Sequence, residues 1–222
     1  VANVADNLAN KIAPRTAVFH TSGSLSSAVL LPLKEAGCSI ASIHPLASIS
    51  SSESASQRFR GAYFCLEGDQ KAVRIGRRLV RDLGGRPFTI DPSAKAIYHA
   101  AAVTAAGHAT ALFDIAITLM MHTGLVRKTA RSVLQPLLAG VAANLQHQDT
   151  AAALTGPFSR ADVATFERHL ACLTESATKG ELIVYLELAS RSLDLAEHRG
   201  INKAAIAKMR KMISLAKRDI EC

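Results

Sequence analysis

The sequence has no tryptophan, and only 5% of its 222 residues are aromatic. A folded core must therefore be built from aliphatic side chains, with alanine and leucine filling most of it. Four cysteines are scattered along the chain without forming a CxxC pair: Cys38, Cys65, Cys172 and Cys222. This usage argues against a disulfide framework and a cysteine zinc site, and it is typical of a reducing cytoplasm.

Several functional motifs are also missing. The eight histidines show neither an HxxxH nor an HxH spacing, so we expect no metal. A serine nucleophile is not expected because there is no GxSxG turn. The first residues carry no signal-peptide pattern and do not begin with methionine, so we expect a chain that starts inside a longer protein or was trimmed. No strand is followed by GxGxxG, the turn that holds a pyrophosphate at a helix N-terminus.

The net charge of +8 and the pI near 9.6 raise the possibility of a nucleic-acid partner. The basic residues do not alternate with aromatic side chains that would stack on bases, so no such partner is expected. In residues 202–220 the lysines share a helix with a regular apolar face, which predicts that they are solvated. Attraction of small molecules that carry phosphate is a secondary expectation.

A single stretch, residues 100–121, is apolar enough to suggest a membrane span. It contains His108, Asp114 and several threonines, and it lacks flanking aromatic residues. We therefore expect no membrane partner and predict a buried helix in a bundle or a dimer core.

The chain divides into two halves of different pattern. Up to residue 91, short β-branched runs alternate with helical patterns, whereas no strand signal follows Pro92. The prediction is an α/β fold followed by an all-α region: a partial Rossmann-like parallel sheet in a domain of residues 1–91, and a helical bundle in a domain of residues 92–222. The expected strands are 16–20, 38–45, 61–68 and 86–91, and the expected helices are 26–37, 69–85, 92–123, 126–147, 160–174, 177–198 and 202–220. The serine-rich segment 48–61 is predicted to be a mobile loop.

Lys95 and His99 are four residues apart and would share one face of a helix. Reduction of a C=O or C=N bond by nicotinamide needs a group that supplies a proton, and this pair could do so at a cleft between the two halves. The alternative is a solvated lysine beside a hydrogen-bonded core histidine. Both interpretations stay open.

Three further segments offer candidate binding residues. The "HTSG" segment, 20–23, follows a strand and could line a pocket, or its serine could cap a helix. His44, at the end of the next strand, is expected to form a pocket wall. Thr155, Arg160 and Asp162 lie in a loop that begins a helix, where Arg160 could bind a carboxylate or phosphate, or pair with Asp162.

Five phrases together resemble one family: "HTSG" (20–23), "HPL" (44–46), "KAIYHAAAV" (95–103), Asn144, and "ALTGPFSRADVATFERHL" (153–170). The chain is similar to the Rossmann-like proteins whose C-terminal helical domain is called domain of unknown function 2520. These proteins are often described as NADP-dependent oxidoreductases, and their layout is similar to that of pyrroline-5-carboxylate reductase and the 6-phosphogluconate dehydrogenase-like enzymes. The resemblance implies catalytic roles for Lys95 and His99. It implies NADP contacts for His20, Thr21, Ser22 and Gly23, and substrate contacts for His44, Thr155, Arg160 and Asp162.

Two departures from the family pattern affect the functional hypothesis. The first βαβ unit with its dinucleotide fingerprint is missing, so we expect weak or absent NADP binding by this chain alone. Ala106 and Gly107 stand where the family usually has Ser-Asn. The first hypothesis is a cytoplasmic, homodimeric NADP-dependent oxidoreductase, or a fragment of one, acting on a small anionic carbonyl or imine compound. The alternative is a non-catalytic dimerising or ligand-binding protein.

Overall fold

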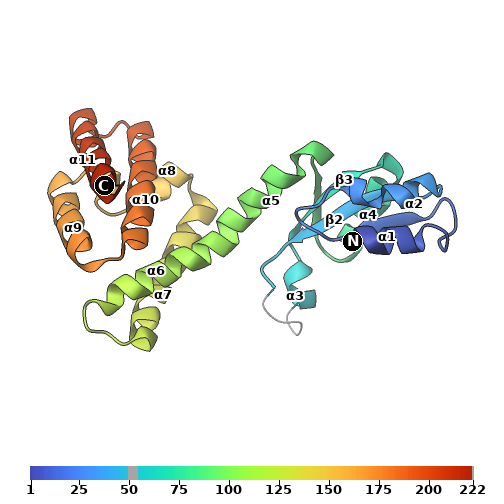
Figure 1. Ribbon diagram of the computed structural model, residues 1–222, viewed down its shortest axis with the longest axis horizontal. Helices are drawn as coiled ribbons and strands as arrows, with labels where there is room; N and C mark the ends of the chain where they lie inside the picture. The colour runs from blue at the N-terminus through green and yellow to red at the C-terminus, as the bar shows by residue number, and fades with distance from the viewer. Residues whose placement is uncertain (50–54, 222) are drawn as a thin grey trace. The chain divides into compact units, whose positions relative to one another are not determined.

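The computed structural model describes residues 1–49 and 55–221, which form two compact units (Figure 1). The first unit comprises residues 1–110 and the second residues 111–222. A continuous helix over Pro92–Met121 carries the chain from one unit into the other. The predicted domain boundary at residue 91 lies where this helix begins.

The described part of the first unit contains a four-stranded sheet in the order β1-β2-β3-β4. Its strands are β1 (Ala17–His20), β2 (Ser39–Leu46), β3 (Tyr63–Gly68) and β4 (Arg86–Thr89). The β1–β2 and β3–β4 pairs are parallel, but β2 and β3 pair antiparallel. The predicted α/β class is therefore confirmed, while the expectation of a parallel sheet is wrong for the central pair. A parallel pair needs a crossover, usually a helix, and the described part of the β2–β3 connection contains only the five-residue α3 (Ala55–Phe59).

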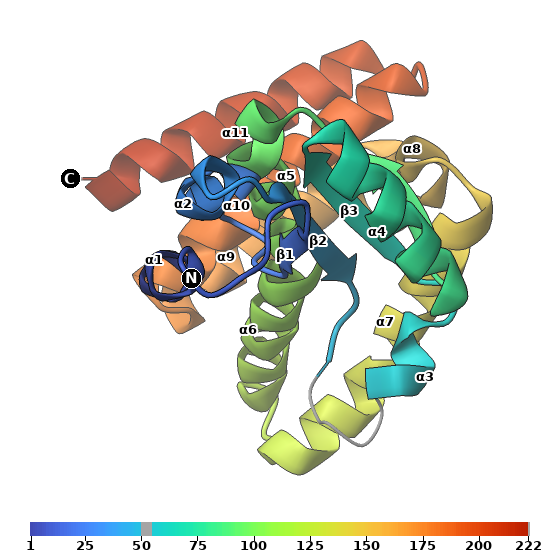
Figure 2. The same ribbon diagram turned by 90° about the vertical axis from the view of Figure 1, so that its right-hand side faces the viewer.

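Helices cover both faces of this sheet (Figure 2). On one face lies α4 (Gln70–Asp82), whose Val80 packs with Ile43, Phe64 and Leu66. On the other face Ile40 packs with residues of α1 (Ala2–Leu8), η1 (Ser27–Leu30) and α2 (Leu31–Glu35). Because neighbouring residues of a strand point to opposite faces, Ile40 and Ile43 contribute to separate cores.

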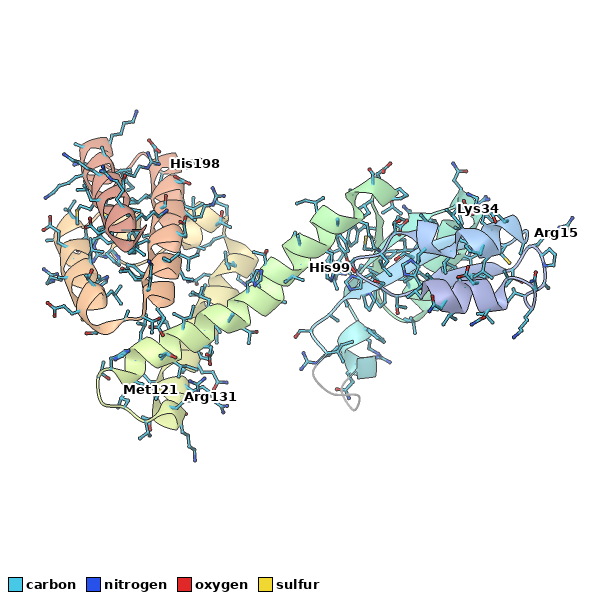
Figure 3. The ribbon with its side chains drawn as sticks, viewed as in Figure 1. Arg15, Lys34, His99, Met121, Arg131 and His198 are labelled. Atoms are coloured by element: carbon cyan, nitrogen blue, oxygen red, sulfur yellow. The ribbon has the colours of Figure 1, made fainter. Side chains whose placement is uncertain are left out.

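The connecting helix is built from four consecutive segments. They are η3 (Pro92–Ala94), α5 (Lys95–Val103), a π-helical turn η4 (Thr104–His108) and α6 (Ala109–Met121, whose last residue is labelled in Figure 3). By length and composition alone this helix could cross a membrane. Only 6% of its apolar 18-residue stretch is buried inside the structure. The prediction that it is buried in a bundle of this chain is wrong, because the described side chains leave most of it exposed. Burial against another molecule stays a prediction.

The second unit is helical, as predicted. It contains α7 (Arg127–His147), α8 (Thr150–Ala153), η5 (Phe158–Arg160), α9 (Val163–Ser176), α10 (Lys179–His198) and α11 (Lys203–Glu221). Phe166, Leu186, Leu193, Ile206 and Met209 form the centre of its apolar core. The short α8 is absent from the sequence-based assignment. Of the predicted loop 48–61, residues 50–54 lie outside the described residues, and Ala55–Phe59 forms α3 instead of continuing the loop.

Candidate functional site

Polar residues gather on the sheet face opposite α4. On β2, Ser42 and His44 point to the same face because they are two residues apart. The strand register places Glu67 opposite Ser42 and Cys65 opposite His44, and His20 pairs with Ser42 from β1. Ser42 and Glu67 are both almost completely buried. The register of three strands therefore collects a polar row under the start of α5.

Lys95, the first residue of α5, inserts its side chain into this row. It is only 2% exposed, and its Nζ donates a hydrogen bond of 2.7 Å to Ser42 Oγ. Its Nζ also lies 3.8 Å from Glu67 Oε1. Burial lowers the pKa of Lys95, although the nearby Cys65 and Glu67 oppose that change. The solvated alternative for this lysine is therefore wrong, while a catalytic role for it stays a prediction.

Glu67 is held in place from its other side by Ser27. The carboxylate accepts hydrogen bonds from the Ser27 backbone N–H, at 2.9 Å, and from the Ser27 hydroxyl, at 2.7 Å. A buried carboxylate needs such partners, because an ion without them is costly to remove from water. Sequence reasoning did not single out Ser27, Ser42 or Glu67. An acidic residue at the end of the apolar run "YFCLEG" is the signal that could have identified Glu67.

His20 and the segment that follows it form a turn bonded within itself. The Ser22 N–H donates to His20 Nδ1 at 3.2 Å, so the proton is on Nε2, which donates to the Ser26 carbonyl at 3.2 Å. Burial lowers the pKa of His20. Ser22 Oγ accepts from the Leu25 N–H within the turn. The alternative that this serine caps a helix is wrong, because the residue that precedes η1 is Ser26 and it makes no side-chain cap bond. Thr21 is exposed.

His44 is joined to α5 through Tyr98. Its Nδ1 lies 2.6 Å from the Tyr98 hydroxyl. Burial lowers the pKa of His44, and the charges of Lys95 and His99 lower it further. Burial also raises the pKa of Tyr98 and of Cys65. Sequence reasoning missed Tyr98, although its position three residues after Lys95 places both on one helix face.

His44, His99 and Gly23 meet at one point. The two imidazole rings are 6.0 Å apart between centroids. A Cβ atom on Gly23 would lie 2.4 Å from a ring carbon of His99 and 2.7 Å from Nε2 of His44. Glycine is therefore required at position 23, because any larger residue would displace both histidines. His99, labelled in Figure 3, projects from α5.

Both histidines line an open cleft of about 390 Å³ within the first unit. The π-helical turn forms part of its wall, a feature that often occurs at functional sites. A Cβ on Gly107 would meet nothing closer than Val103, at 3.7 Å, so the wall is open there. Lys95 lies behind the cleft and does not line it. The remaining lining residues are small or apolar: Pro45, Leu46, Ala47, Ser48, Ala102, Val103, Ala105, Ala106 and Gly107.

A second groove of about 370 Å³ includes three of the predicted cofactor residues, His20, Thr21 and Ser22. Its other lining residues are apolar side chains of α1, β1, η1 and α2. Within the described residues, no lysine or arginine lines this groove. Thr21 and Ser22 could therefore contact an uncharged part of a dinucleotide, but the groove offers no cation for its phosphates. Gly23 lies under the two histidines and is buried.

The predicted substrate residues of the second unit form a local structural motif. Arg160 pairs with Asp162 at 3.3 Å, and Arg160 also donates to the Gly156 carbonyl. Asp162 accepts the Thr165 N–H at 3.1 Å and so caps the start of α9. The ion-pair alternative is confirmed, Thr155 is exposed, and substrate binding by these residues stays a prediction. Among the described residues, no group of three or more His, Cys, Asp or Glu could hold a metal.

The profile of the family called domain of unknown function 2520 matches residues 62–192. A Thermotoga maritima protein of known structure is 28% identical, with a TM-score of 0.74 over 87% of this chain and 74% of that protein. A Bacteroides fragilis protein provisionally named an NADP oxidoreductase is 20% identical, with a TM-score of 0.63 over 80% of this chain and 65% of that one. Plasmodium falciparum pyrroline carboxylate reductase, solved with NADP bound, is 14% identical, with a TM-score of 0.50 over 88% and 75% of the two chains. No curated protein matches the sequence. These likenesses show a Rossmann-like sheet followed by a helical region.

Proposed function

Because the chain belongs to the domain of unknown function 2520 family, we propose that it is an NADP-dependent oxidoreductase that reduces a carbonyl or imine compound. The observation that carries this proposal is the cleft in which His44 and His99 meet beside the π-helical turn. The fold supports it through the likeness to a protein provisionally named an NADP oxidoreductase and to a pyrroline carboxylate reductase solved with NADP bound. Fold alone does not determine function, so the proposal depends on the site.

The cleft supplies the proton that such a reaction needs. When bound, NADPH supplies the hydride that adds to the carbon of the C=O or C=N bond. The oxygen or nitrogen of that bond takes up a proton, for which His99 is the proposed donor because it lines the cleft. Lys95 sits behind Tyr98, with its Nζ 5.5 Å from the centre of that ring. Its proposed part is to set the electrostatic environment of the histidines.

Thr21 and Ser22 are the proposed contacts of the cofactor's nicotinamide end. They lie at the carboxyl end of β1, the edge of an α/β sheet where ligands usually bind. Because the groove offers the phosphates no lysine or arginine among its described residues, we expect this chain alone to bind NADPH more weakly than micromolar. The anionic group predicted on the substrate would need Arg160, which remains a separate proposal.

Nuclear magnetic resonance with NADPH at millimolar concentration tests this function. The expected result is a set of shift changes at Thr21, Ser22, His44 and His99. When a ketone such as 2-heptanone is added as hydride acceptor, NADPH should be oxidised as the ketone is reduced to the alcohol, and His99→Asn should abolish this turnover. His198→Asn, an exposed histidine of the second unit, is the matched control. If NADPH shifts no residue of the first unit, the non-catalytic ligand-binding alternative replaces this proposal.

We also propose that the protein is a homodimer formed through α7. All 21 residues of α7 are described, and of these Ala130 is buried. Val133, Leu137 and Val141 are exposed and follow one another at intervals of four, which makes an apolar stripe along one face. A stripe of this kind on a chain of this size indicates a protein interface. The free thiols Cys38 and Cys65 support the proposed cytoplasmic location.

A further inference from the structure

We propose that the histidine-lined cleft binds an uncharged carbonyl or imine group by a hydrogen bond from Nε2–H of His44, and that Tyr98 is the positioning residue that fixes this tautomer. This deepens the proposed function, because it names the chemistry of the group that enters the cleft. The binding step itself requires no cofactor, so it is tested separately from reduction.

The direction of the Tyr98 hydrogen bond follows from the strength of its possible acceptors. The phenol has one proton, and its oxygen lies 2.6 Å from His44 Nδ1. The Cys65 thiol is the other possible acceptor beside it. An imidazole nitrogen is a strong acceptor, whereas a thiol sulfur is a weak one. The phenol proton is therefore assigned to His44.

A neutral imidazole that accepts at Nδ1 carries its proton on Nε2. Nε2 of His44 faces the point where Gly23 and His99 meet, since the Cβ position of Gly23 is 2.7 Å away. Within the described residues Nε2 makes no hydrogen bond, yet no buried side-chain nitrogen or oxygen lacks a partner. No described residue therefore occupies Nε2, and we assign its N–H as the donor to a ligand in the cleft.

The walls of the cleft determine which ligand suits this donor. In the described part of the chain, its lining offers no lysine, arginine, aspartate or glutamate. The positive charge of Lys95 lies behind the wall and faces the carboxylate of Glu67. A carboxylate placed among Leu46, Ala102 and Val103 would lose water without gaining a lysine or an arginine as partner, which is unfavourable. A small uncharged group with one acceptor atom loses far less.

The tautomer is measured first, by nitrogen-15 nuclear magnetic resonance of the histidine rings without any ligand. The expected wild-type result is a proton on Nε2 of His44 and none on Nδ1. Tyr98→Phe keeps the ring but removes the donor, so the proton should then be shared between the two nitrogens. Tyr63→Phe, at an exposed tyrosine of β3, is the matched control and should leave the tautomer unchanged. A wild-type proton on Nδ1 overturns the proposal.

The ligand chemistry is measured next with two probes of equal length, 2-heptanone and 6-oxoheptanoate. The neutral ketone should shift the resonances of His44 and Gly107, and the oxo acid should bind at least tenfold more weakly. His44→Phe should weaken ketone binding by about two- to tenfold, the usual effect of losing one hydrogen bond. Gly107→Leu, which fills the cleft, should abolish it. Tighter binding of the oxo acid, or ketone binding unchanged by His44→Phe, refutes the assignment.

Failure of this inference is distinguishable from failure of the proposed function. If the ketone binds as expected but NADPH shifts no residue of the first unit, the cleft is a binding site and the reductase function is wrong. If NADPH binds beside His99 but His44 carries its proton on Nδ1, the reductase function stands and the role assigned to Tyr98 is wrong.

Discussion

The sheet face beneath α5 and the helical core of the second unit are both shielded from water, but their chemistry is opposite. The first contains the Lys95–Glu67 ion pair, in which the ammonium donates to one serine and the carboxylate accepts from another. The second is lined by Phe166, Leu186, Leu193 and Met209, with no charged residue among its buried members in the described chain. An aliphatic core tolerates many combinations of side chains, whereas a buried ion pair needs both of its members.

This difference indicates what each region contributes. Replacing a buried ion pair by apolar residues of similar size is often neutral or stabilising, so a pair of this kind is weak evidence of a purely structural role. The helical core stabilises its unit through the burial of apolar side chains. Burial and then the charge of Lys95 lower the pKa of His44, so we propose that the buried pair serves this histidine.

The largest expected effect comes from separating the buried pair. Glu67→Leu leaves Lys95 without its carboxylate and should lower the free energy of unfolding by about 3–5 kcal/mol. Urea unfolding followed by circular dichroism measures this. The double variant Lys95→Met with Glu67→Leu should be more stable than Glu67→Leu alone, because no charge is then left unpaired.

Two controls complete that comparison. Leu186→Ala in the helical core should leave a cavity and lower the free energy of unfolding by about 2–5 kcal/mol. Substituting a charged residue as well should not restore that stability. Glu187→Leu removes an exposed partner of Lys217 and should change stability by about 1 kcal/mol or less. If Glu67→Leu changes the free energy of unfolding as little as Glu187→Leu does, the buried pair contributes no more to stability than a surface pair.

The comparison can be sharpened at the apolar stripe of α7, whose residues Val133, Leu137 and Val141 are exposed. Leu137, 66% exposed, lies in the centre of its stripe. Leu137→Glu would place an unpaired charge in the proposed dimer interface and should weaken association at least about tenfold, which corresponds to about 1.4 kcal/mol. Gln135→Glu adds the same charge off the stripe and should leave the dimer intact. A wild-type monomer by light scattering at micromolar concentration would contradict the proposed homodimer.

The dependence of stability on pH should also differ between the two regions. Burial lowers the pKa of both His20 and His44 in the folded protein, below the value of about 6.5 for an unfolded histidine. The unfolded chain then binds more protons below that value, so stability is complete above it and is lost as the pH falls. Unfolding at pH 7 and at pH 5.5 should show this loss, reduced in His44→Gln. His198→Gln is the control for removing a histidine. If His44→Gln loses as much stability between pH 7 and pH 5.5 as the wild type, the loss does not arise from His44.

The sequence was sufficient for the order of the strands and the long helices, because long periodic patterns and glycine punctuation mark their ends. The short helices α1, α3 and α8 were not predicted. The predicted strand at 38–45 is β2 at Ser39–Leu46, and the predicted helix 177–198 is α10 at Lys179–His198. The antiparallel pairing of β2 with β3 was not predictable, since alternation along a chain says nothing about strand direction. Strand register is also a long-range property.

For the candidate site, the sequence predicted relations within one segment of the chain but not those between segments. Helical spacing correctly placed Lys95 and His99 on neighbouring positions of one helix, and local chain geometry correctly joined Arg160 to Asp162. The burial of Lys95 depends on Ser42 of β2 and Glu67 of β3, which both lie beneath the start of α5. Tyr98 acquires its role only when β2 brings His44 to it. Spacing along one helix cannot show such partners.

The smallest expected effect tests whether the Arg160–Asp162 motif is structural or binds substrate. Arg160 is exposed and its pair with Asp162 is on the surface, so Arg160→Ala should lower stability by about 1 kcal/mol or less. Asp162→Ala removes the cap of α9 as well as the pair, and should lower the melting temperature further. Asp162→Asn keeps a capping oxygen while it removes the charge, so its melting temperature should lie nearer to that of the wild type. If Arg160→Ala leaves the melting temperature unchanged but abolishes binding of an anionic substrate, the arginine serves the ligand and the ion pair is secondary.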